Sequence, residues 1–154
     1  MIESIATRPA AEALRRVFIG ETSPDVDVVD QEQLEAVYAE VWERVTRQDF
    51  EGALGPLLFL VMHDPYEFRF QFSYGLCLQQ EGRVAHAAKH YGLAWMLDPS
   101  DAGCAYRLGE CHAVLGDREA ATEAFETAIA LCVAPQFNAE IRLASEAALQ
   151  KLNA

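Results

Sequence analysis

Residues 74–97 read YGLCLQQEGRVAHAAKHYGLAWML, and residues 108–131, which lie 34 positions later, read LGECHAVLGDREAATEAFETAIAL. Both stretches place small residues where two helices would cross, a glycine where the chain would turn, and an aromatic ring in the second half. The matched pairs are Gly75 and Gly109, Cys77 and Cys111, Gly82 and Gly116, Ala87 and Ala121, Tyr91 and Phe125, Ala94 and Ala128, and Leu97 and Leu131. A helix–turn–helix unit of this length explains each of these residue types.

Each repeated residue type has a structural role in such a unit. Gly75 would let the first helix approach the second closely, and Gly82 would allow a left-handed turn between them at little cost. Ala87 would lie where the second helix crosses the first, and Tyr91 would fill the space behind that crossing. Pro99 would end the unit, because proline cannot continue a helix. This period is that of the tetratricopeptide repeat (TPR), so we predict an all-α fold of tandem TPR units.

The chain has 154 residues, which is the size of one domain, and we predict three such units in it. The expected boundaries are residues 34–67, 68–101 and 102–135. The first unit is the least regular, because Val41 stands where the glycine of the first helix is expected. Gly55 and Pro56 fall within its second helix, and we expect them to kink or delay that helix.

Accessory helices are expected on both sides of the units. Residues 1–33 would form an N-terminal helix over 8–19 and then an acidic loop, in which Asp30 and Gln33 have the spacing of a capping box. Residues 136–154 would form a helix that covers the apolar face of the last unit. The residues expected to turn inward from this capping helix are Ile141, Ala144, Ala148 and Leu152.

Composition excludes several kinds of partner. The formal charge is −12, from 24 acidic and 12 basic side chains, so phosphate backbones and anionic membrane surfaces should be repelled. No apolar run approaches the roughly 20 residues that a membrane helix needs. The N-terminus has an early acid and no signal-peptide pattern. We therefore expect a cytoplasmic protein that binds neither nucleic acid nor membrane.

The sequence offers no convincing catalytic or metal site. The four cysteines contain no C-x-x-C pair, and we expect reduced, buried thiols. His86 and His90 have the i,i+4 spacing that can hold zinc, but no third ligand is near, so an exposed helix face is the preferred interpretation. Nucleophile-elbow, phosphate-loop and dinucleotide motifs are absent from the sequence. We expect no enzyme, no cofactor and no metal.

The first helices of the three units would line a concave groove. Tyr38, Phe72 and Tyr106 recur at the repeat spacing and should point into it together, although any of them could instead pack between units. One turn further along come Trp42, Leu76 and Glu110, and the basic residues of these faces are Arg69 and Arg107. So few basic residues argue against a site for acidic chaperone tails. The aromatic rings favour an apolar segment of a partner protein.

The chain resembles the type III secretion class II chaperones, which guard hydrophobic translocator proteins in the bacterial cytoplasm. The resemblance extends over residues 34–131. It rests on LEAVY at 34–38, FEGA at 50–53, DPYEFRF at 64–70, YGLCLQ at 74–79, GEC at 109–111 and the glycine at 116. The Tyr-x-x-Arg-Phe run and the Glu-Cys pair are more particular to this family than the glycines and alanines.

The resemblance implies a chaperone that holds one or two translocator clients in an export-competent state. Tyr38 and Phe50 match aromatic positions of the family's binding pocket, whereas Val45 replaces an aromatic residue. The predicted client-binding residues are Tyr38, Trp42, Phe50, Arg69, Phe72, Leu76 and Tyr106.

Two further partners and one alternative function remain open from the sequence. Family members tend to dimerise through the N-terminal helix, and Leu14, Val17 and Phe18 could form that interface or pack on the first unit. A regulatory protein could bind the chaperone once it is free of client. The alternative function is a TPR scaffold that joins folded proteins in a secretion or signalling assembly.

Overall fold

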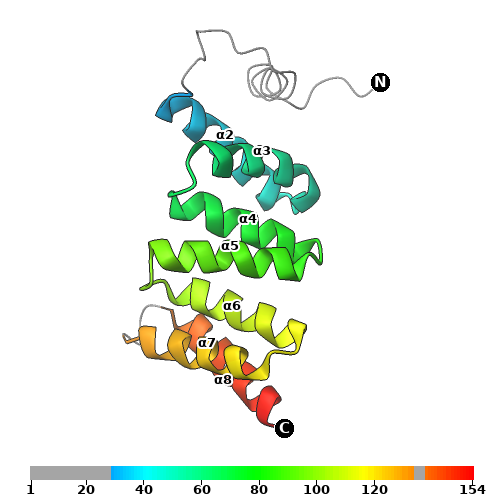
Figure 1. Cartoon of the computed structure of the whole chain (residues 1–154), viewed down its shortest axis with the longest axis vertical. Coiled ribbons are helices and arrows are strands. Elements are labelled where there is room, and N and C mark those ends of the chain that lie inside the picture. The colour runs from blue at the N-terminus through cyan, green and yellow to red at the C-terminus, as the bar shows by residue number, and fades with distance from the viewer. Residues whose placement is uncertain (1–28, 134–137) are drawn as a thin grey trace.

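The computed structural model describes residues 29–133 and 138–154, and within them it contains seven α-helices and no strand. The helices are α2 (Gln31–Thr46), α3 (Phe50–His63), α4 (Phe68–Gln80), α5 (Val84–Leu97), α6 (Ala102–Leu115), α7 (Arg118–Leu131) and α8 (Ala139–Asn153). They stack in chain order along the long axis of the molecule (Figure 1). The prediction of an all-α fold is confirmed, while the unit boundaries stay a prediction. The helix predicted over 8–19, with Leu14, Val17 and Phe18, lies outside the described residues.

Side-chain caps and glycine turns set the ends of these helices. The expected capping box is present at α2, where Asp30 accepts from the backbone N–H of Gln33 at 2.8 Å and the Gln33 side chain accepts from the Asp30 N–H at 3.0 Å. The side chains of Asp49, Asp101 and Asp117 cap α3, α6 and α7 by accepting from the backbone N–H three residues on, without the reciprocal bond. Gly82 and Gly116 adopt φ values of +75° and +83°, so both turns need the left-handed backbone that glycine supplies.

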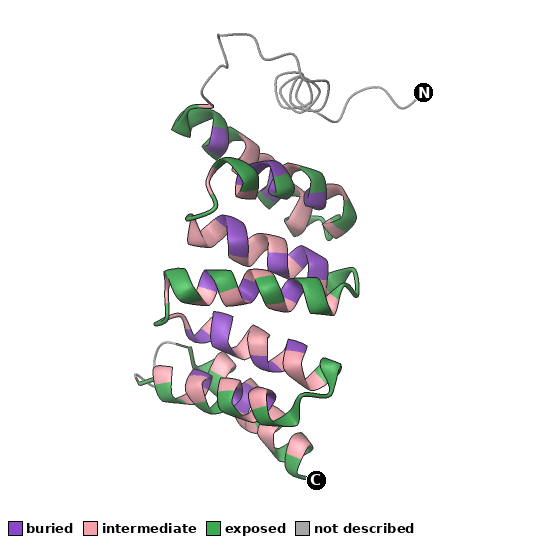
Figure 2. Ribbon diagram, viewed as in Figure 1, coloured by how far each residue is buried: buried purple, intermediate pink, exposed green. Residues whose placement is uncertain are grey.

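A glycine faces an aromatic ring at the centre of the second and third helix pairs. A Cβ atom added to Gly75 would lie 3.0 Å from the ring of Tyr91, and one added to Gly109 would lie 2.6 Å from the ring of Phe125. Tyr91 and Phe125 are almost completely buried in this position. Figure 2 shows the buried residues on the faces that the helices turn toward one another. The repeated Gly–aromatic pair of the sequence is therefore the contact that joins the two helices of a pair.

Gly55 and Pro56 were expected to kink or delay the second helix of the first unit; the delay is wrong, and the kink stays a prediction. Helix α3 begins at Phe50 and continues to His63 with Pro56 inside it. A proline in a helix interior costs one hydrogen bond and about 3 kcal/mol. Residues on both sides of Pro56, namely Ala53, Leu57 and Leu60, have no exposed surface. Their burial stabilises the helix against the loss of that hydrogen bond.

Helix α8 covers the end of the stack by packing on α7 and α6. Its side toward them includes Ser145, which is completely buried and whose hydroxyl donates to the carbonyl of Ile141 at 2.7 Å. The four residues predicted to turn inward are all partly buried, as a capping role requires: Ile141, Ala144, Ala148 and Leu152.

Candidate functional site

The predicted binding residues lie mainly on the first helices of the three pairs, and polar contacts join these helices directly. Between α2 and α4, the Tyr38 hydroxyl lies 3.2 Å from the Ser73 hydroxyl. Between α4 and α6, the Gln79 amide donates to Glu110 Oε2 at 3.0 Å. We call the surface on which α2, α4 and α6 meet the inner face; it carries Tyr38, Trp42, Arg69, Phe72, Leu76, Gln79, Tyr106 and Glu110.

Arg69 is neutralised by two carboxylates. Its Nη2 donates to Glu35 Oε1 on α2 at 2.6 Å, and its Nε donates to Glu67 Oε1 at 3.2 Å. These bonds raise the pKa of Arg69 and, through the same guanidinium, hold the pKa of Glu67 below its usual value. The guanidinium also lies 5.1 Å from the ring centroid of Tyr38, within the range of a cation–π contact. Arg69 thus joins α2 to α4 and covers part of the Tyr38 ring.

Glu110 organises the polar end of the inner face, where α4 meets α6. Its Oε1 accepts from the Tyr106 hydroxyl at 2.8 Å, and its Oε2 accepts from Arg107 at 2.9 Å and from Gln79. Gln79 in turn accepts from the buried Tyr91 hydroxyl at 2.9 Å. Burial, with the bond to Glu110, raises the pKa of Tyr106. Sequence reasoning named Glu110 but missed this network, because its partners lie on three different helices.

The three aromatic residues that recur at the repeat spacing belong partly to the core. Each is half-buried, and its ring packs against a buried ring. The ring centroids are 5.4 Å apart for Tyr38 and Phe70, 5.4 Å for Phe72 and Tyr91, and 5.8 Å for Tyr106 and Phe125. These rings therefore support the helix packing as well as any binding surface.

The remaining predicted residues differ in how much surface they present. Trp42 is 65% exposed on α2, and Leu76 is half-buried on α4. Phe50 begins α3 rather than a first helix, and it packs against the hydrophobic core. Trp42 therefore offers the largest free aromatic surface among the predicted residues.

The described part of the chain contains no group of three or more His, Cys, Asp or Glu side chains that could hold a metal ion. Burial raises the pKa of the Cys77 and Cys111 thiols to about 11 and that of the Cys104 thiol to about 12. These thiols are protonated at neutral pH and are poor nucleophiles. His90, one of the spaced histidines, bonds Gln71 through Nδ1 at 2.9 Å.

No described helix has the length and apolar character needed to cross a membrane. No family model matches the sequence, and no curated protein matches it either.

Solved structures, in contrast, match most of the chain. The type III secretion chaperone SycD of Yersinia enterocolitica, in complex with a peptide of the translocator YopD, has a TM-score of 0.77 at 20% identity over 81% of this chain and 95% of SycD. PcrH of Pseudomonas aeruginosa, in complex with the chaperone binding region of PopD, has a TM-score of 0.75 at 26% identity over 80% of this chain and 93% of PcrH. The resemblance to the type III secretion translocator chaperones is confirmed.

A type III secretion complex of Aeromonas hydrophila extends the match. It has a TM-score of 0.77 at 26% identity and covers 94% of this chain and 95% of its own. This match therefore extends over nearly the full length of both chains.

Proposed function

We propose that this protein is a chaperone that binds hydrophobic translocator proteins of a type III secretion system on its inner face. The observation that carries this proposal is the shared fold with SycD and PcrH, both solved with a bound translocator segment. A feature of this protein itself also supports the proposal, namely the exposed indole of Trp42 on the inner face. Aromatic rings of this kind are frequent anchors of protein interfaces.

The inner face suggests which kind of segment is bound. Its α2–α4 part offers the apolar surfaces of Trp42, Phe72 and Leu76. Its α4–α6 part offers the carboxylate of Glu110 and the side chain of Gln79. A client segment would place apolar side chains over α2 and α4, and backbone or side-chain donors toward Glu110. Occupancy would keep the client soluble by mass action, without an energy source.

Other properties belong to the same proposal. The chaperone would act in the bacterial cytoplasm, without catalysis, and release its client at export. SycD has been solved in an alternative dimer, and a homodimer through Leu14, Val17 and Phe18 stays a prediction for this chain. A regulatory partner for the client-free chaperone also stays a prediction.

The test is capture of partners from the source bacterium with secretion blocked. The inner-face variant is Trp42→Ala with Leu76→Ala, because substitution of Tyr38, Phe72 or Tyr106 would also remove core contacts. The matched control removes two apolar side chains elsewhere, Tyr66→Ala with Met96→Ala, which are 82% and 78% exposed.

The parent and the control should capture one or two proteins with long hydrophobic segments, and the inner-face variant should lose them. Capture of folded, soluble partners by all three proteins would contradict the chaperone and favour the scaffold.

A further inference from the structure

A hollow of about 200 Å³ opens between α5, α6 and α7. Its base is formed by Ala105 and Leu108 of α6, and the indole of Trp95 on α5 forms one wall. Small and polar side chains of α7 also line the hollow, together with His112 of α6. These lining residues are His112, Ala120, Glu123, Ala124 and Thr127.

The corresponding place one unit earlier is filled. The positions equivalent to Leu108 and Ala124 in the preceding unit carry Tyr74 and His90. There the Tyr74 ring lies 4.5 Å from the His90 ring, and His90 is held by a hydrogen bond to the buried Gln71. Two smaller residues, leucine for tyrosine and alanine for histidine, thus leave the third unit open where the second is closed.

The hollow is separate from the inner face. Leu108 lies two positions from both Tyr106 and Glu110, which is about 200° around a helix. It therefore projects from the side of α6 opposite to the residues of the inner face. In Figure 1, α6 lies between α5 and α7, consistent with its forming the base of the hollow.

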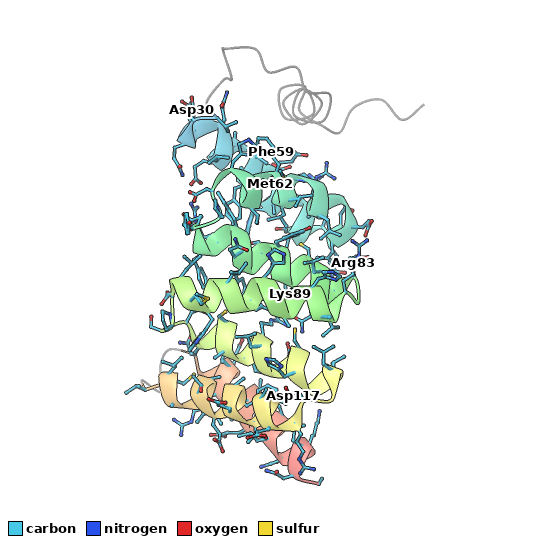
Figure 3. The ribbon with its side chains drawn as sticks, viewed as in Figure 1. Asp30, Phe59, Met62, Arg83, Lys89 and Asp117 are labelled. Carbon is cyan, nitrogen blue, oxygen red and sulfur yellow. The ribbon has the colours of Figure 1, made fainter. Side chains whose placement is uncertain are left out.

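An acidic ridge borders the hollow on α7. Glu119, Glu123 and Glu126 are exposed, share one side of the helix, and form no ion pair with any described residue. Arg118, at the start of α7, lines the same surface as the three glutamates, and its guanidinium donates to the Asn153 side chain of α8 at 3.4 Å. Glu123 belongs to both the ridge and the rim of the hollow. The corresponding positions of α5 are Ala85, Lys89, labelled in Figure 3, and Gly92.

We propose that the hollow and the acidic ridge form a second docking site, which takes a bulky apolar side chain from a basic segment of a partner protein. The apolar side chain is buried between Trp95 and Ala124, and lysine or arginine side chains beside it lie along Glu119, Glu123 and Glu126. The hollow and the ridge occur together in the third unit, and both are missing from the second. Charge complementarity makes a basic partner the occupant, and it also accelerates its association.

The test uses the synthetic peptide acetyl-KKFKK-amide. In a Trp42→Phe background Trp95 is the single tryptophan, since the chain has 2, so its fluorescence reports occupation of the hollow. The filled variant combines Leu108→Tyr with Ala124→His and copies the closed arrangement of the second unit. We expect it to bind the peptide about tenfold more weakly, as expected when an anchor side chain loses its pocket. Exchange of the three ridge glutamates for glutamine should weaken binding about fivefold and remove most of its salt dependence.

Control peptides and variants make the result decisive. Acetyl-KKAKK-amide should bind at least about fivefold more weakly than the phenylalanine peptide, because it lacks the anchor. The proposal would be overturned if the filled variant bound the phenylalanine peptide as tightly as the parent does. It would also be overturned if the inner-face variant Leu76→Glu no longer bound that peptide. A peptide with residues 12–20 of this chain, EALRRVFIG, provides a further comparison. If it bound more tightly than the phenylalanine peptide, the occupant would be the protein's own N-terminal segment and not a partner protein, and the proposal would be overturned. None of these measurements depends on a translocator client.

Discussion

Replacement of Trp42 by alanine should separate client binding from folding more cleanly than any other inner-face substitution. Trp42 lies on α2 and is 65% exposed. A tryptophan side chain buries up to about 250 Å². The exposed 65% of Trp42 thus corresponds to roughly 160 Å², or about 4 kcal/mol at about 25 cal/mol per Å², if a client covers it completely. The remaining third contributes at most about 2 kcal/mol to folding, since area estimates are upper bounds.

We therefore expect Trp42→Ala to weaken client binding by about 2–4 kcal/mol, which is about thirtyfold or more. The free energy of unfolding should fall by no more than about 1–2 kcal/mol. Isothermal titration with the client segment recovered by capture measures the first quantity, and guanidinium unfolding measures the second.

Phe72→Ala provides the contrast. The centroid of its ring lies 5.4 Å from that of the buried Tyr91 ring. Removal of the Phe72 ring should therefore lower the free energy of unfolding by about 2–4 kcal/mol. The reasoning would be refuted if Trp42→Ala left client affinity unchanged, or if it lowered stability as much as Phe72→Ala does.

Two further predictions concern stability. Gly109→Ala should destabilise the protein by roughly 1–3 kcal/mol, because its Cβ would lie 2.6 Å from the Phe125 ring. Gly92→Ala should stabilise it by about 0.5–1 kcal/mol, because a Cβ there would have no atom within 4 Å. Urea unfolding of the two variants measures both changes in the free energy of unfolding. Arg69 keeps the pKa of Glu67 low in the folded protein, so the Arg69–Glu67 ion pair stabilises the fold above pH about 4.3. This stabilisation is lost as the pH falls through the lower pKa that Glu67 has in the folded protein. Melting temperatures of the parent and Arg69→Met should differ near neutral pH and converge toward pH about 3; a constant difference would contradict the ion pair.

The fold could be predicted because the residues that join each helix pair recur at a fixed distance. Gly75 and Tyr91 contact each other within one unit, and Gly109 and Phe125 do so in the next. The sequence indicated these repeated positions as the ones where two helices pack, but not that each glycine faces the ring. The continuity of α3 through Pro56 could not be read in this way. That continuity depends on the burial of α3 against α2 and α4. Contacts with other helices cannot be read from the residues around Pro56 alone.

The candidate site was only partly predictable for a similar reason. The regular repeat spacing indicated which residues share the inner face, but not how much of each ring the core already uses. Arg69 was predicted to be a basic client-binding residue, yet Glu35 is its counterpart one unit earlier and pairs with it at 2.6 Å. Residues at equivalent positions of successive units are neighbours in space, so this pair could have been found by comparing the units. The bonds around Glu110 connect non-equivalent positions, and that comparison would still have missed them.

The distribution of charge gives the two proposed sites different selectivities. Six arginines of the described part pair with carboxylates, namely Arg44, Arg47, Arg69, Arg83, Arg107 and Arg142. Among the described residues, the excess of acid is therefore carried by unpaired carboxylates such as those of the α7 ridge.

A client on the inner face is held mainly by apolar area, which salt does not screen, whereas a basic segment at the ridge is held in part by exposed charges. Between about 0.05 and 0.5 M salt, client affinity should change little, while the affinity of the basic peptide should fall several-fold. If both affinities fell together, a single acidic surface would be responsible for both. The division into an apolar inner face and a charged outer site would then be wrong.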